Sequence, residues 1–294
     1  SISGEHPDDG FGSAIAIAND GFWIGAPHGT TGKAYRWNDR QLQLMVEGAG
    51  RLGAHLANTS DGIWISAPLT NSGEGAIYDG QGQLRFEGSS GTGIVVSSAG
   101  SGAYADSGGW RSVDGRSAST ESRPTAIAEA NGAIGVGFAL GSTAFASGSA
   151  ELSRSKMGDE AGFSVAAGDV DGDGIQEWII GSPGSNTVTA HDSSDLSVVA
   201  QWAGSGRFGT AITVCDLDGN GREDLIVGAP FQGRNGTVTR YADFSPSPSP
   251  WDFDWPEASL QVGTAMACGN GSLVVGAPGS PESHGQAIAI HRSP

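Results

Sequence analysis

The sequence contains few basic residues. Its 15 Lys and Arg stand against 32 Asp and Glu, which gives a formal net charge of −17. Proteins bind nucleic acids and anionic membrane surfaces through basic patches. The charge balance therefore argues against both partners, and it suits a protein that holds divalent cations.

Cysteines and long apolar runs are also scarce. Two cysteines, Cys215 and Cys268, are too few for a disulfide scaffold. Because cysteine is often simply buried, we expect two buried thiols. A disulfide bond between them remains the alternative. No apolar run approaches the roughly 20 residues that span a bilayer, so we expect no direct membrane insertion. The first ten residues lack the pattern of a signal peptide.

Glycine, by contrast, is abundant. The chain has 49 glycines and 13 prolines, and the glycines follow no Gly-X-Y period, which excludes a collagen-like chain. Short apolar runs lie between them. This pattern predicts an all-β fold with many tight turns.

The chain repeats one pattern of strands. An aromatic or aliphatic residue and a glycine open a short alternating strand, and a polar turn leads to a second strand that ends in Gly-Ala-Pro or a near copy. A third strand follows a Gly-rich turn, and a weaker fourth strand ends the unit. The units open near residues 11, 52, 92, 123, 161, 208 and 262, and those between 92 and 150 are the most degenerate. Seven units of four strands, with a period of about 40 residues, predict a seven-bladed β-propeller of four-stranded antiparallel blades that spans residues 1–294 as a single domain.

The ends of the chain predict how this ring would close. The last unit stops at its third strand, in residues 287–294, whereas residues 1–4 look like the end of a fourth strand. We expect residues 1–4 to complete the seventh blade, because closure removes open strand edges that invite aggregation.

Several units share the same pair of short motifs. These pairs are Phe11-Gly12 with Gly25-Ala26-Pro27, Leu52-Gly53 with Ser66-Ala67-Pro68, Phe208-Gly209 with Gly228-Ala229-Pro230, and Val262-Gly263 with Gly276-Ala277-Pro278. In these motifs the chain resembles the FG-GAP repeat of integrin alpha-subunit β-propellers and their bacterial integrin-like relatives. The resemblance implies a seven-bladed propeller that is extracellular or at the cell surface and serves adhesion or ligand binding. It also implies calcium loops between the first and second strands of some blades.

Two acidic segments match such a loop. In each, oxygen ligands at positions 1, 3 and 5, a main-chain carbonyl at position 7 and a carboxylate at position 9 would surround a hard cation. The candidate ligands are Asp169, Asp171, Asp173, the carbonyl of Ile175 and Glu177 in the first segment, and Asp216, Asp218, Asn220, the carbonyl of Arg222 and Asp224 in the second. Calcium accepts about six to eight such oxygens in irregular geometry, whereas magnesium demands a stricter octahedron. We therefore expect two Ca²⁺ sites.

The EF-hand opens with the same spacing but needs a glutamate at position 12. That position holds Ile180 in the first segment and Val227 in the second, and a strand pattern follows each segment. We reject the EF-hand on these grounds. The remaining alternative is a solvated acidic turn without a metal.

The sequence contains no evident catalytic motif. It has neither HExxH nor GxSxG, and its six histidines are scattered. A carboxylate pair for glycoside cleavage stays open because acidic residues are plentiful. We expect no enzyme. Two alternatives to a ligand-binding module remain. One is an enzyme with its active site at the mouth of the central channel, and the other is a passive scaffold within a larger surface protein.

A ligand surface is expected on the loops that follow the Gly-Ala-Pro motifs, on the face opposite the calcium loops. These loops lie at residues 28–31, 69–71, 110–111, 231–234 and 280–284. They include Trp, Arg and Phe, which are frequent interface anchors. The Ser-Pro-rich segment 242–257 is expected either to pack along the sixth blade or to contact a partner. No motif identifies that partner, a protein or a glycan, and we expect a monomer or one domain of a larger protein.

Overall fold

The computed structural model describes most of the chain. It covers residues 1–69, 74–90, 94–95, 102–106, 109–112, 117–118, 124–138, 142–146, 149–152, 159–249, 261–269, 271–279 and 284–291. Within these residues every element is a β-strand except one short 3-10 helix, η1 (Ala242–Phe244). The predicted all-β fold is confirmed. No helix in the described ranges is long and apolar enough to cross a membrane.

The chain divides into two compact units. The first comprises Ser1–Pro124 and Val274–Ala289, and the second comprises Thr125–Leu273 and Ile290–Pro294. Both acidic segments belong to the second unit.

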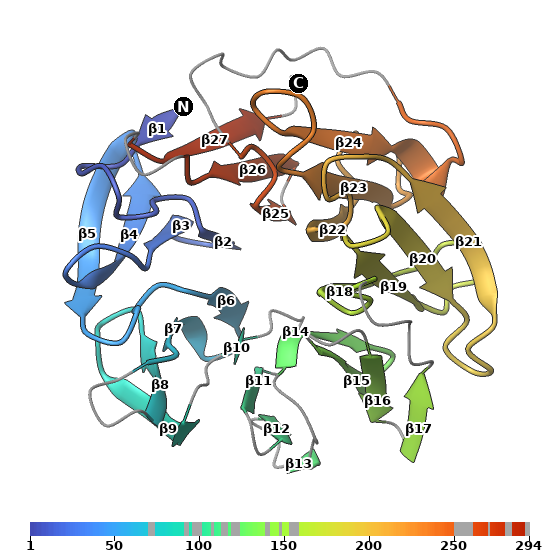
Figure 1. The fold of residues 1–294 in the computed structure, drawn as a ribbon, viewed down its shortest axis with the longest axis horizontal. Helices are drawn as coiled ribbons and strands as arrows, with labels where there is room; N and C mark the ends of the chain where they lie inside the picture. Colours follow the sequence, from blue (N-terminus) through green and yellow to red (C-terminus); the bar gives the residue numbers. More distant parts are fainter. Residues whose placement is uncertain are drawn as a thin grey trace. The chain divides into compact units, whose positions relative to one another are not determined.

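Three four-stranded antiparallel sheets, each in chain order, form most of the first unit (Figure 1). They are β2 (Ala14–Ala18), β3 (Gly21–Ala26), β4 (Gly32–Asn38) and β5 (Gln41–Gly48); β6 (Leu56–Thr59), β7 (Gly62–Ala67), β8 (Glu74–Asp79) and β9 (Leu84–Ser90); and β10 (Ile94–Val95), β11 (Ala103–Asp106), β12 (Gly109–Ser112) and β13 (Ser117–Ala118). This unit also holds β1 (Ile2–Ser3) and most of β26 (Ser272–Ala277) and β27 (Gln286–His291).

The second unit repeats the same organisation. Its sheets are β14 (Pro124–Ala130), β15 (Ala133–Phe138), β16 (Ser142–Ala146) and β17 (Ser149–Leu152); β18 (Ser164–Gly168), β19 (Glu177–Ser182), β20 (Thr187–His191) and β21 (Val198–Ala203); and the three-stranded β22 (Ala211–Cys215), β23 (Asp224–Ala229) and β24 (Thr237–Tyr241). The first strands of successive repeats, β18, β22 and β25 (Ala265–Gly269), lie side by side. Several four-stranded antiparallel sheets in chain order are the arrangement of propeller blades. Seven blades in one closed ring stay a prediction.

The second strand of each clear repeat is the most buried one. All six residues of β19, EWIIGS, and all six of β23, DLIVGA, are buried. A strand covered on both faces is expected to be an almost continuous apolar run, and the apolar residues here fit that rule. The exceptions are the acidic residues that open the two strands, Glu177 and Asp224.

The shared glycines have a steric reason. A Cβ on Gly181, at the end of β19, would overlap the carbonyl oxygen of Gly209, and one on Gly228, at the end of β23, would overlap that of Gly263. Gly209 and Gly263 open the following repeats and have φ values of 92° and 89°, which glycine adopts without strain. The paired motifs therefore mark places where two successive repeats meet backbone to backbone.

The N-terminal residues form a short strand in the first unit. Ile2 and Ser3 in β1 pair antiparallel with Ala287 and Gln286 in β27, and the Gly4 N–H donates to the Gly285 carbonyl at 2.8 Å. Ile2 is buried. Closure of a ring by this pair stays a prediction.

The two cysteines form a disulfide, so the expectation of two free thiols is wrong. Cys215 ends β22 and Cys268 lies in β25, with their Cα atoms 6.1 Å apart. That separation suits a bridge. The two positions are 53 residues apart in the chain. Only the adjacency of β22 and β25, which residue types alone do not give, brings them together.

Candidate metal centre

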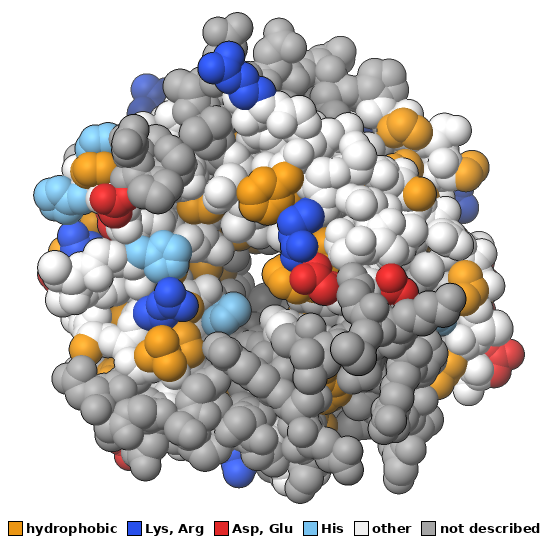
Figure 2. All heavy atoms as spheres, viewed as in Figure 1, with side chains coloured by type: hydrophobic (Ala, Val, Ile, Leu, Met, Phe, Trp, Pro, Cys, Tyr) orange, Lys and Arg blue, Asp and Glu red, His pale blue; other side chains and the backbone are white. Residues whose placement is uncertain are grey.

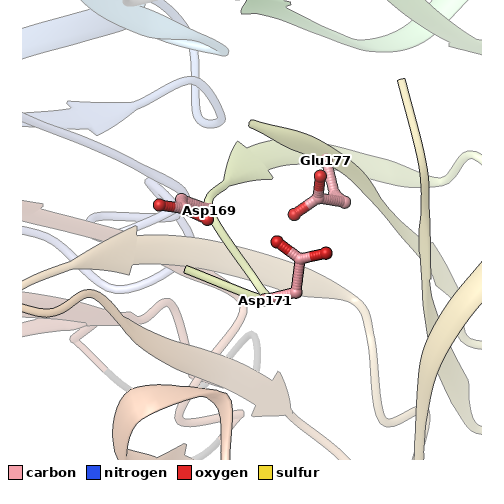
Figure 3. A group of neighbouring side chains, drawn as sticks. All are labelled: Asp169, Asp171 and Glu177. Carbon is pink, nitrogen blue, oxygen red and sulfur yellow. The ribbon is translucent and has the colours of Figure 1, made fainter. Parts of the chain in front are cut away.

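The first acidic segment is the connection between β18 and β19. Asp169 follows the last residue of β18 directly, and Glu177 is the first residue of β19. One carboxylate oxygen from each of Asp169, Asp171 and Glu177 lies within 4.8 Å of the other two. Figure 3 shows the carboxylates of Asp171 and Glu177 facing one another, with Asp169 beside them.

Backbone hydrogen bonds coil this loop around the carboxylates. Asp169 accepts the N–H groups of Gly172 at 2.7 Å and Gly174 at 3.0 Å, and Glu177 accepts that of Val170 at 2.8 Å. Gly172 and Gly174 have φ values of 82° and 87°, the left-handed conformation that glycine tolerates best. The spacing of acids and glycines thus sets the local geometry.

The electrostatics of the loop are unfavourable without a cation. Glu177 is 2% exposed. Burial, together with the negative charges of Asp171, Asp173 and Asp169, raises the pKa of the Glu177 carboxyl above its ordinary value, although the Val170 N–H acts the other way. A cation among these carboxylates would relieve both effects.

The donor set fits calcium. Ca²⁺ binds carboxylate oxygens at about 2.3–2.6 Å, so two ligands of one ion lie at most about 5 Å apart. Oxygens from Asp169, Asp171 and Glu177 meet that limit. These residues would hold the ion, which would supply positive charge to a turn that contains four acids.

The other two predicted ligands of this loop lie in its exposed part. Asp173 accepts the N–H of Ile175 at 2.7 Å, and the side chains of both residues are exposed. Asp173 is not one of the three residues whose oxygens converge. Its negative charge nevertheless acts on Glu177.

Neighbouring residues anchor the first loop from two sides. Asn131, in the turn between β14 and β15, donates to the Gln176 carbonyl at 3.0 Å and accepts the Gln176 N–H at 3.3 Å. Glu223, from the second acidic segment, accepts the N–H of Asp169 at 3.1 Å. The two acidic loops therefore touch within the second unit.

The second acidic loop, between β22 and β23, coils in the same way. Asp216 accepts the N–H groups of Asn220 and Gly221, and Asp218 also accepts that of Asn220. The Asn220 side chain accepts the Arg222 N–H at 2.7 Å. At position 9, Asp224 accepts the N–H of Leu217, as Glu177 does with Val170.

A guanidinium group distinguishes the second loop from the first. Nη2 of Arg240, on β24, lies 2.5 Å from Asp218 and donates to both carboxylate oxygens of Asp224, at 3.0 and 2.9 Å. Asp224 is fully buried. Within the described ranges, the group of three acidic, His or Cys ligands close enough for one metal is that of the first loop. Arg240 was not predicted from the sequence, because the residue spacing of the second acidic segment does not indicate it.

The predicted ligand-binding loops are only partly described. His28 and Leu69 in the first unit, and Phe231 and Arg234 in the second, are exposed. Figure 2 shows histidine and basic side chains among apolar ones on the drawn face of the first unit. The expectation for Trp110 is wrong, because it lies in β12 and is buried by its neighbours. Residues 70–71 and 280–283 lie outside the described residues.

The first half of the 242–257 segment packs against the sheets of the second unit. Phe244, in η1, is buried, and the Ser245 carbonyl accepts the indole N–H of Trp202 at 3.0 Å. Ser249 forms an antiparallel bridge with Arg240 of β24. The predicted packing along this sheet is therefore found for residues 242–249, while 250–257 lie outside the described residues.

Comparisons with known proteins identify the repeat. The FG-GAP repeat model matches residues 161–199 and 208–239, which contain the two acidic loops. In fold, the chain is similar to the crystal structure of the computationally designed Ika8 protein, with a TM-score of 0.58 and 15% identity over 99% of this chain and 98% of that one. At this identity the likeness concerns the fold alone. No curated protein matches the sequence.

Proposed function

The chain carries FG-GAP repeats at residues 161–199 and 208–239, and from this we propose that it is a calcium-binding, integrin-like β-propeller module that binds a protein or glycan ligand. In this proposal its sheets are seven blades of one closed ring over residues 1–294, and β1 completes the last blade. The pairing of β1 with β27 supports that closure.

The observation that carries the calcium proposal is the buried Glu177 carboxylate beside Asp169 and Asp171. Like charges at this distance repel one another, and burial adds to the cost. A calcium ion reverses the sign of that interaction. Because it binds the folded loop and not the unfolded chain, it stabilises the fold by linkage.

The ligand is placed on the loops that follow the second strands. In the second unit, the loop after β23 exposes Phe231 and Arg234, and it lies at the end of β23 opposite the acidic loop. Phe231 is 56% exposed, and aromatic residues and arginine are enriched at protein interfaces. We assign it a binding role rather than a catalytic one.

An extracellular or cell-surface location completes the proposal. Disulfides persist in oxidising compartments and are rare in the cytosol. The bridge between Cys215 and Cys268 supports such a compartment. A monomer, or one domain of a larger surface protein, fits this role.

One experiment tests the binding function. A glycan and protein array is probed with the wild-type chain in calcium and in EDTA, and then with Phe231→Ser/Arg234→Ser. The control is Leu84→Ser, which changes a 51% exposed apolar residue on β9 instead. We expect a ligand whose affinity falls about tenfold or more in the double variant and in EDTA, and is kept in the control. Equal binding by the double variant would show that this loop is not the ligand site.

A further inference from the structure

We infer that Arg240 is a built-in cation of the second acidic loop, residues 216–224, and takes the place of a metal ion there. The loop is then ordered without calcium, and of the two acidic loops only the first binds the ion. The contrast with the first loop rests on the proposed calcium binding, whereas the role of Arg240 is tested without any metal.

Arg240 contacts two of the five predicted metal ligands of the second loop, Asp218 and Asp224. Its guanidinium joins position 3 of the loop, Asp218, to position 9, Asp224, through Nη2. The Arg240 side chain is 16% exposed and that of Asp224 is 0% exposed. Among the described residues, Nε of Arg240 is buried without a hydrogen-bond partner, and the hydrogen bonds to Asp218 and Asp224 are donated by Nη2.

Charge explains why this arrangement is stable. Removing Asp224 from water is costly unless an opposite charge and hydrogen bonds compensate. The carboxylate has both, since Arg240 supplies the charge, and the N–H groups of Leu217 and Asp243 donate to its oxygens. Burial by itself lowers the pKa of Arg240, but the two carboxylates outweigh it and raise that pKa, so the guanidinium stays charged.

Strand register shows why the first loop lacks this cation. In β23, Ile226 pairs with Arg240, and the equivalent residue of β19, Ile179, pairs with Ala190. Ala190 has no group that can reach an acidic loop, so this position supplies no positive charge to the carboxylates of Asp169, Asp171 and Glu177. In this inference, the residue at this position of the third strand determines whether an arginine or a bound metal ion balances the charge of the loop.

The first repeat shows independently that an arginine at this position reaches the turn. In β3, Trp23 pairs with Arg36, which has the same place in its sheet as Arg240. Arg36 donates to Asp20, in the turn between β2 and β3, at 3.0 Å. That turn is short and carries one acidic residue beside the strand, and the ion pair is half exposed.

The decisive variant is Arg240→Ala, which installs the residue that the first loop has at this position. In EDTA we expect its melting temperature to fall by roughly 5–15 °C, because the buried Asp224 loses its partner. The matched control is Arg36→Ala, which breaks the exposed pair with Asp20 and should cost about 0–3 °C. Equal, small shifts in both variants would overturn the inference.

Calcium titration of the unmodified chain and of two double variants provides the second measurement. We expect isothermal titration calorimetry to show calcium binding that Asp169→Asn/Asp171→Asn abolishes and that Asp216→Asn/Asp218→Asn leaves intact. Loss of a bound ion in the second double variant would overturn the inference. No calcium binding at all would instead contradict the proposed function, while the EDTA melting experiment would still decide the role of Arg240.

Discussion

Position 9 of the acidic loops shows one type of residue in two environments. Glu177 and Asp224 each open a fully buried strand and each accept the N–H of position 2 in their own loop. Asp224 has Arg240 as its partner, whereas burial and the charges of three aspartates raise the pKa of Glu177. A buried carboxylate among like charges destabilises the fold, so ion binding and ionisation at Glu177 have measurable consequences for stability.

Glu177→Gln should have opposite effects with and without calcium. Glutamine keeps the size of the side chain and an oxygen for the Val170 N–H, but it removes the charge that repels the aspartates. In EDTA we expect the melting temperature of the variant to equal or exceed that of the wild type. In saturating calcium the wild type should gain roughly 5–10 °C and the variant should gain little, as measured by calorimetry. Glu87→Gln, which alters an exposed carboxylate on β9, serves as the control and should respond to calcium as the wild type does.

The pH dependence without metal follows from the same residue. The pKa of Glu177 is raised in the folded state above its ordinary value of 4.5, so the folded chain binds this proton more tightly than the unfolded chain. The free energy of unfolding should therefore fall as pH rises from about 4.5 through the raised pKa, and level off above it. The measurement is the free energy of unfolding in EDTA between pH 4 and 8, taken as the difference between wild type and Glu177→Gln, in which the contributions of carboxylates outside this loop cancel. A difference that does not change with pH would contradict the shift.

Two elements, the acidic loops, show what residue spacing predicts and what it does not. Alternating acids and glycines specify a coil that folds back on its own backbone N–H groups, and both loops adopt it. In our proposal, the need for a metal depends on a side chain of the third strand, and only the strand register brings that side chain into reach. Arg240 lies 16 residues after Asp224, and Ala190 takes its place beside the first loop. For the same reason, spacing could not reveal the bridge between Cys215 and Cys268.

The Gly-Ala-Pro motif makes a prediction at the same scale. A Cβ on Gly181 would overlap both the carbonyl oxygen of Gly209 and the hydroxyl of Ser164, so β19 and the next repeat would have to separate. We expect Gly181→Ala to lower the free energy of unfolding by more than about 2 kcal/mol in chemical denaturation. The control is Gly269→Ala at the end of β25, where no atom of the described residues lies within 4 Å of the added carbon and the cost should be below about 1 kcal/mol. Similar losses of unfolding free energy in both variants would show that Gly181 is not required for the contact between repeats.

At the scale of the whole molecule, repetition made the fold readable from one sequence. Most sheets are local in the chain, since strands such as β18 to β21 follow one another and pair with their neighbours. A recurring sequence pattern therefore predicts the same local structure several times. Agreement among the repeats makes that prediction firm without any knowledge of long-range contacts. Pairings between distant parts of the chain are harder to predict, because each occurs once and no second repeat shows the same pattern.

The pairing of β1 with β27 is such a long-range contact, and it makes the last prediction. Ile2 is buried and Ser3 is exposed in the same two-residue strand, so a charge at the two positions should act differently. Ile2→Asp should lower the melting temperature by roughly 5–15 °C, and Ser3→Asp should leave it within about 3 °C.

Deleting residues 1–4 should also expose the edge of β27, whose free N–H and C=O groups can pair with another chain. Light scattering over a range of concentrations should then detect association that the wild type lacks, and a deletion variant that stays monomeric and equally stable would contradict the idea that β1 closes the molecule.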